Sequence, residues 1–77
     1  MEHVFPNFPR IVLSKDMCMG KPRIKGTRIT VSSVLGYLAG GMSTDDFLKE
    51  FHWVEREDVL QALAFSANII NALEYRQ

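Results

Sequence analysis

The sequence predicts a mainly α fold, in which a small N-terminal β hairpin or strand pair is followed by a trihelical helix-turn-helix core. Two observations support this prediction. All three prolines and two of the five glycines fall in residues 1–30, where the apolar runs are short and strand-like. Residues 31–77 instead show helical spacing to the end. Because 77 residues correspond to one domain, we expect a single domain over residues 1–77 that begins with a basic β-like arm.

Residues 1–30 are expected to contain two extended stretches joined by a turn. Arg10–Ser14 is rich in aliphatic and β-branched residues, which predicts a short strand. Lys15–Gly20 predicts the turn. Lys21–Thr30 predicts a second extended stretch, interrupted at Gly26, where a bend or a positive φ angle is favoured.

The first two predicted helices are delimited by their terminal residues. Thr30 is a suitable N-cap for a helix over Val31–Ala39, and Gly40-Gly41 ends that helix. Ser43 then caps a short second helix, which has acidic residues in its first turn. Short connections between the helices favour the helix-turn-helix arrangement.

The third helix is expected to begin near Glu55–Asp58 and to run to about Arg76. From Val59 to Leu73, 11 of 15 residues are apolar, whereas a surface helix needs only one apolar stripe. Either a second chain covers the remainder, as in a homodimer or a complex with a partner protein, or residues 1–14 fold back and bury it. The residues expected at a partner or dimer interface are Leu60, Ala64, Phe65, Ile69 and Ala72.

Charge is unevenly distributed along a chain whose formal net charge is zero. Residues 1–30 carry a charge of +4 and residues 31–77 a charge of −4. This asymmetry indicates either two surfaces with different partners or two halves that attract each other within one fold.

The basic segment is a candidate nucleic-acid contact. In an extended strand, Lys21, Arg23 and Lys25 would point to one side, where they could meet phosphates. The alternatives are an acidic protein partner or a solvated strand edge. The beginning of the third helix is acidic, which disfavours major-groove reading by that helix. The candidate nucleic-acid-binding residues are Lys21, Arg23, Lys25, Thr27 and Arg28.

Catalysis, metal binding and membrane insertion are not expected. His3 and His52 lack a ligand pattern, Cys18 lies between two methionines, and no acid–base or nucleophilic set stands out. We therefore expect no enzyme activity, no cofactor, no metal and no small-molecule substrate. Residues 1–10 lack the basic start and the apolar run of a signal peptide, and no run of about 18 apolar residues occurs, so we expect a cytoplasmic protein without a membrane segment.

Three segments carry a resemblance to a known family. Gly20–Val31 is G-K-P-R-I-K-G-T-R-I-T-V, Gly36–Phe51 contains G-G-M-S-T-D-D-F, and Arg56–Ala67 is R-E-D-V-L-Q-A-L-A-F-S-A. Together they resemble the prokaryotic domain of unknown function 433 family over roughly Arg10 to Ala67. The chain departs from the family pattern at Asp16-Met17, where Asp-Pro is usual, and at Phe51-His52, where Tyr-Pro is usual.

The resemblance implies a homeodomain-like helix-turn-helix core and an antitoxin role similar to that of VapB-type antitoxins. Such antitoxins bind and silence a small PIN-like ribonuclease toxin, and many also bind their own promoter DNA. From this resemblance we expect a non-enzymatic antitoxin in a toxin-antitoxin system that neutralises a PIN-like toxin by direct contact. A DNA-binding transcriptional regulator that uses the basic segment is the alternative.

Overall fold

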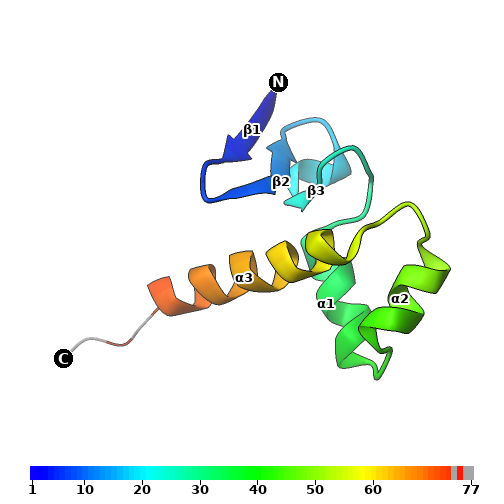
Figure 1. The fold of residues 1–77 in the computed structure, drawn as a ribbon. Coiled ribbons are helices and arrows are strands. Elements are labelled where there is room, and N and C mark those ends of the chain that lie inside the picture. Colours follow the sequence, from blue (N-terminus) through cyan, green and yellow to red (C-terminus); the bar gives the residue numbers. More distant parts are fainter. Residues whose placement is uncertain (74, 76–77) are drawn as a thin grey trace.

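The computed structural model describes residues 1–73 and 75 and contains a three-stranded antiparallel N-terminal sheet followed by three helices (Figure 1). The elements are β1 (Glu2–Phe5), β2 (Phe8–Ser14), the short 3₁₀ turn η1 (Cys18–Gly20), β3 (Arg23–Ile24), α1 (Val31–Ala39), α2 (Thr44–Glu50) and α3 (Arg56–Ala72). The expectation that the third helix reaches Arg76 falls outside the described residues.

The sheet has the order β1-β2-β3, with β2 in the centre. Strand β1 is absent from the sequence prediction, and β2 begins two residues earlier than predicted. The ladder pairs Val4 with Val12 and then shifts register before Phe5, which pairs with Phe8. Pro9 lies opposite this irregularity, where a strand tolerates a residue without an N–H group.

Left-handed backbone conformations turn the chain between β2 and α1. Gly26 has a φ angle of 79°, as its position predicts. Cys18 and Met19 have φ angles of 51° and 56°, a region that residues with a side chain rarely adopt. The connection is therefore a tight turn with two strained residues.

The predicted caps of the first two helices are confirmed. The Thr30 side chain accepts a hydrogen bond from the Ser33 N–H, and the Ser43 side chain accepts one from the Asp46 N–H at 3.0 Å. Gly41, just beyond α1, has a φ angle of 103°. These local interactions fix where α1 and α2 begin and end.

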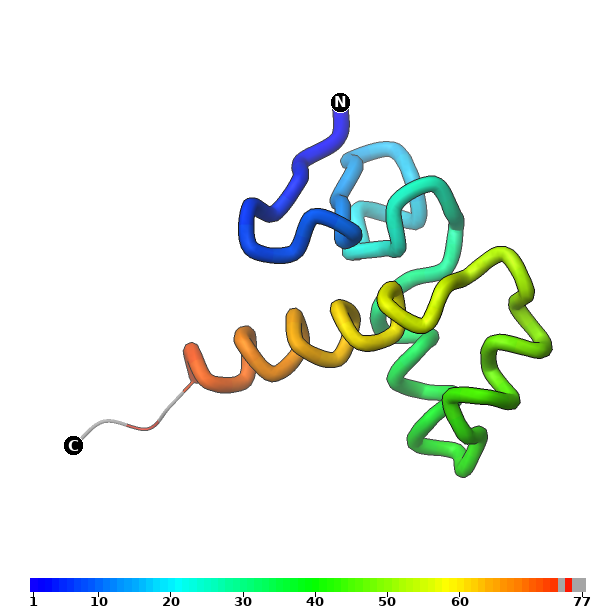
Figure 2. The backbone as a smooth tube through the Cα atoms, in the orientation of Figure 1, coloured from blue at the N-terminus to red at the C-terminus, as the bar shows by residue number. Residues whose placement is uncertain are grey.

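The core is shared by the sheet and all three helices. Ile11 of β2, Ile24 of β3, Val34 of α1, Phe47 of α2 and Val59 of α3 are each at most 1 % exposed. The sheet lies over one side of α3, while α1 and α2 lie at the other side near the beginning of α3 (Figures 1 and 2). Residues 1–30 are therefore packed into the domain and do not form a free arm. Among the described residues, no helix combines the length and apolarity needed to cross a membrane.

Candidate functional site

Helix α3 is only partly covered by the rest of the chain. Val59, Ala62 and Phe65 face the core and are at most 5 % exposed. The C-terminal part of α3 extends past α1 and α2, with the β1–β2 hairpin beside it (Figure 1). Ile70 lies in this part of the helix and is 66 % exposed, and Leu73, directly after the helix, is 73 % exposed. The alternative that residues 1–14 bury the whole helix is therefore wrong for the described residues.

Phe65, one of the predicted interface residues, is packed into the core. It is 5 % exposed, and its ring packs edge-on against Phe5 and Phe8. The centroid distances are 4.9 Å to Phe5 and 5.5 Å to Phe8. Both phenylalanines belong to the β1–β2 hairpin. The burial of Phe65 could not be predicted from the sequence because the prediction lacked β1.

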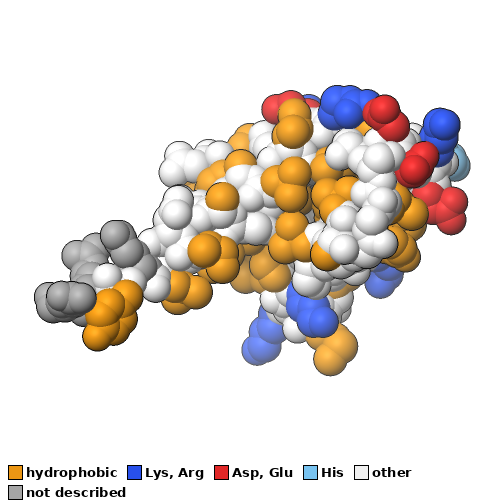
Figure 3. Space-filling view, turned by 90° about the horizontal axis from the view of Figure 1, so that it is seen from below, with side chains coloured by type: hydrophobic (Ala, Val, Ile, Leu, Met, Phe, Trp, Pro, Cys, Tyr) orange, Lys and Arg blue, Asp and Glu red, His pale blue; other side chains and the backbone are white. Residues whose placement is uncertain are grey.

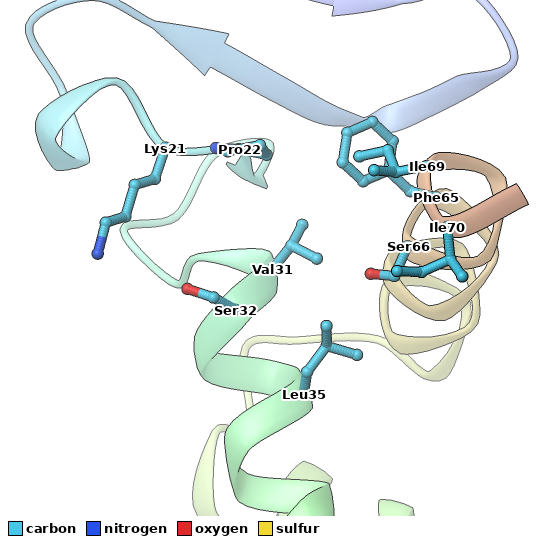
Figure 4. Close-up of a pocket in the computed structure, with 9 residues that line it drawn as sticks. All are labelled: Lys21, Pro22, Val31, Ser32, Leu35, Phe65, Ser66, Ile69 and Ile70. Atoms are coloured by element: carbon cyan, nitrogen blue, oxygen red, sulfur yellow. The ribbon is translucent and has the colours of Figure 1, made fainter. Parts of the chain in front are cut away.

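A groove opens between α1 and α3 and is lined mainly by apolar side chains. Figure 4 shows Val31 and Leu35 of α1 facing Phe65, Ile69 and Ile70 of α3. The volume of this α1–α3 groove is about 510 Å³. Its lining residues are Lys21, Pro22, Val31, Ser32, Leu35, Phe65, Ser66, Ile69 and Ile70.

The polar residues of the groove lie so that its centre stays apolar. The Ser66 hydroxyl donates to the Ala62 carbonyl oxygen at 2.8 Å and is satisfied within its own helix. Lys21 runs along the edge with its ammonium pointing away from α3 (Figure 4). The groove therefore offers an apolar floor with one positive charge at its margin.

A second exposed apolar surface lies along α3. We call it the outer stripe; its residues are all exposed, and they are Leu60, Leu63, Ala64, Ala67 and Ile70. Leu60 is 51 % exposed and Leu63 is 39 % exposed. Hydrophobic side chains follow the projecting part of the molecule and continue onto its body in the space-filling view (Figure 3).

The predicted interface residues are thus divided among several surfaces. Leu60 and Ala64 belong to the outer stripe, and Ile69, which is 45 % exposed, lines the groove. Ala72 is exposed near the end of α3. The sequence prediction did not include Leu35 of α1 or Pro22, whose placement beside α3 depends on the tertiary fold.

The basic segment does not present its residues on one side. Arg23 is 2 % exposed, and its Nη2 donates to Glu2 Oε2 at 2.9 Å and to Ser14 Oγ at 3.2 Å. The expectation that Lys21, Arg23 and Lys25 share an exposed face is therefore wrong. Glu2 belongs to β1, the strand that the sequence prediction missed.

The remaining residues of that segment have separate roles. Lys21, Lys25 and Arg28 are exposed. The Thr27 hydroxyl donates to the Ile24 carbonyl oxygen at 2.8 Å and accepts from the Ile29 N–H at 3.0 Å, so it stabilises the turn. Three cations of the segment therefore remain exposed, and each lines a different hollow of the surface.

Internal ion pairs occupy the beginning of α3. Arg10 Nη1 lies 2.7 Å from Glu55 Oε1 and 3.0 Å from Asp58 Oδ1. Hydrogen bonds to Glu55 and then to Asp58 raise the pKa of Arg10 above its ordinary value. Arg56 pairs with Asp45 of α2. These contacts tie β2 and α2 to α3.

Nothing in the described part of the chain forms a candidate metal centre, since it holds no suitable group of three or more His, Cys, Asp or Glu side chains.

A family model described as "Protein of unknown function (DUF433)" matches residues 11–66, from within β2 to the middle of α3. No curated protein and no solved structure matches the chain. Ile69 and Ile70 lie beyond the matched range.

Proposed function

Since the chain belongs to the DUF433 family of proteins of unknown function, we propose its role from its own geometry: it is a non-catalytic, antitoxin-like protein that inhibits a PIN-like ribonuclease by direct contact. The observation that carries the proposal is the open α1–α3 groove, about 510 Å³ in volume and lined mainly by apolar side chains. Exposed apolar surface of this kind is typical of protein-binding sites.

An apolar segment of the ribonuclease is the proposed occupant of the groove. Grooves between helices bind partner helices or chain segments by enclosing a few apolar anchor side chains. Leu35 and Ile69 provide facing walls for such anchors. Phe65 lies at the base and is held in place by the hairpin, so the groove is largely formed before binding.

Charge complementarity supports a ribonuclease as the partner. Lys21 lies at the groove margin, and Lys25 and Arg28 are exposed in the same segment. An acidic nuclease cleft would attract these cations and would orient the two proteins as they associate. The proposal also includes a homeodomain-like helix-turn-helix arrangement of α1, α2 and α3, used here as a protein-binding scaffold.

DNA binding is the second candidate function, and Lys21, Lys25 and Arg28 are the observation that favours it. The guanidinium of Arg23 is buried against Glu2, so three exposed cations of this segment remain. The acidic N-terminal turn of α3 would face phosphates unfavourably. A DNA-binding regulator would therefore use the loop after β3 in preference to α3.

Inhibition of any PIN-like ribonuclease that a neighbouring gene encodes tests the proposal. Cleavage of a fluorescent RNA would be followed while the protein is titrated, and the complex would be measured by isothermal titration calorimetry. Ile69→Glu should weaken binding at least tenfold because it puts a charge into the groove, whereas the matched variant Asn68→Glu should bind normally. A ribonuclease that retains full activity with excess protein would overturn the proposal. A salt-sensitive shift of promoter DNA would then favour the regulator.

A further inference from the structure

The outer stripe has the spacing of a helix-pairing seam. Leu60, Leu63, Ala67 and Ile70 follow one another at intervals of three, four and three residues. This is the interval pattern of positions a and d in a two-helix coiled coil. At about 100° per residue, the stripe lies roughly opposite the buried side chain of Phe65. It is therefore a second apolar face of α3, separate from the one that fills the core.

We propose that this face pairs with the same face of a second copy of the chain, with the two α3 helices antiparallel. The first argument is charge. Sixteen of the 18 Asp, Glu, Lys and Arg residues precede Val59, and none lies between Val59 and Leu73. Two copies can therefore approach along this segment without like-charge repulsion. In a two-fold interface the same residues occur on both sides, so any charged residue there would face its own kind.

The sizes of the side chains favour the antiparallel direction. In that direction Leu63 of one copy meets Ala67 of the other, and Leu60 meets Ile70. Each layer then matches a large side chain with a smaller or equal one, as close packing requires. A parallel pair would place Ala67 against Ala67 and leave a gap. It would also bring the two acidic beginnings of α3 together.

The shape of the chain supports the same direction. The C-terminal part of α3 projects from the body, so antiparallel pairing puts the two bodies at opposite ends of the helix pair (Figures 1 and 2). Each projecting part then lies beside the first turns of the other α3. A parallel pair would crowd both bodies at one end.

The expected dimer is weak. A stable interface buries about 800 Å² on each partner, which is roughly a seventh of this chain's surface of 5549 Å². The stripe offers less, because two of its five residues are alanines and Leu63 is only 39 % exposed. We expect a dissociation constant on the order of tens of micromolar.

This inference does not depend on the proposed function, because the groove and the outer stripe share only Ile70. Ala67→Glu changes the stripe and leaves the groove intact, and Ile69→Glu does the reverse. Ribonuclease inhibition should survive Ala67→Glu, so failure of either proposal can be recognised by itself.

Sedimentation velocity of the full chain between about 1 and 300 μM tests the pairing. The wild-type protein and Asn68→Glu should shift from monomer to dimer as concentration rises. Ala67→Glu should stay monomeric, with a dissociation constant raised at least tenfold. An equimolar mixture of Ala67→Glu and Leu63→Lys should restore the dimer, because position 67 of one copy meets position 63 of the other in the antiparallel pair.

Circular dichroism establishes that each variant is folded. A wild-type protein that remains monomeric at 300 μM would overturn the inference. Unchanged dimerisation of Ala67→Glu would overturn it as well, since the dimer would then use another surface. A mixture that fails to associate while the wild type dimerises would exclude the antiparallel register.

Discussion

The ring of Phe5 packs edge-on against the ring of Phe65, with centroids 4.9 Å apart and planes inclined at 61°. This contact joins the first strand to the last helix across 60 residues of sequence. It closes the core on the sheet side of α3, and Phe65 also lines the α1–α3 groove. The N-terminal strand thus stabilises the helix that carries the proposed binding surfaces.

Phe5→Ala should lower the free energy of unfolding by about 2 kcal/mol, less than for a fully buried phenylalanine because Phe5 is half-buried. Urea denaturation followed by circular dichroism measures the change. Val4→Ala is the control: Val4 is the neighbouring strand residue and is 42 % exposed. We expect it to cost under about 1 kcal/mol. Equal effects of the two variants would contradict a special role for the Phe5–Phe65 contact.

A second prediction concerns the ion pair between the buried Arg23 and the exposed Glu2. Within residues 1–73 and 75, Nε and Nη1 of Arg23 have no hydrogen-bond partner, so Glu2 and Ser14 provide much of its compensation. Glu2→Gln should cost about 1 kcal/mol, a value discounted because the Glu2 side chain is 41 % exposed. In the background of Arg23→Met, the same change should cost nothing measurable. A double-mutant cycle by urea denaturation would show additive effects if the pair made no contribution.

Local signals in the sequence predicted the helices well. A threonine or serine at the N-cap needs only its own next three residues to form its hydrogen bond, so Thr30 and Ser43 were identifiable without the tertiary fold. The glycines after α1 and in the β3 loop were identifiable for the same reason. The excess of apolar residues on α3 also predicted an uncovered surface.

Non-local contacts were not predictable in this way. Strand β1 is short, is followed by Pro6 and lies at the sheet edge, so no local pattern distinguishes it from a loop. Missing it left two core contributions unassigned, namely Phe5 against Phe65 and Glu2 against Arg23. Phe65 and Arg23 were consequently predicted to lie on the surface. The groove was hidden too, because it forms where α1 meets α3.

Stability at acid pH should depend on Asp45. The hydrogen bond from Arg56, and then its charge, hold the pKa of Asp45 below its ordinary value of 3.8. The folded protein therefore binds this proton less readily than the unfolded chain does. The stabilisation is complete above about pH 4 and is lost as the pH falls through the lower folded-state pKa.

Asp45→Asn should therefore flatten the acid limb of the stability profile. Thermal unfolding midpoints between about pH 2 and 6 measure this, and Asp16→Asn, in the exposed turn after β2, is the control. The difference between Asp45→Asn and the wild type should shrink in high salt, because the pair is exposed. A constant difference across this pH range would show that the carboxylate contributes nothing through its charge.

The strained turn at Met19 gives the last prediction. Met19 has a φ angle of 56° and its side chain is 90 % exposed, so its side chain adds little packing while its backbone is held in the left-handed region. Met19→Gly should raise the free energy of unfolding by about 0.5–1 kcal/mol. Glycine relieves the backbone strain, and this gain is partly offset because glycine has more conformational entropy to lose on folding. Met19→Ala is the control, since alanine removes the side chain but keeps the strain. Equal stability of the two variants by urea denaturation would show that the strain is not felt at this position.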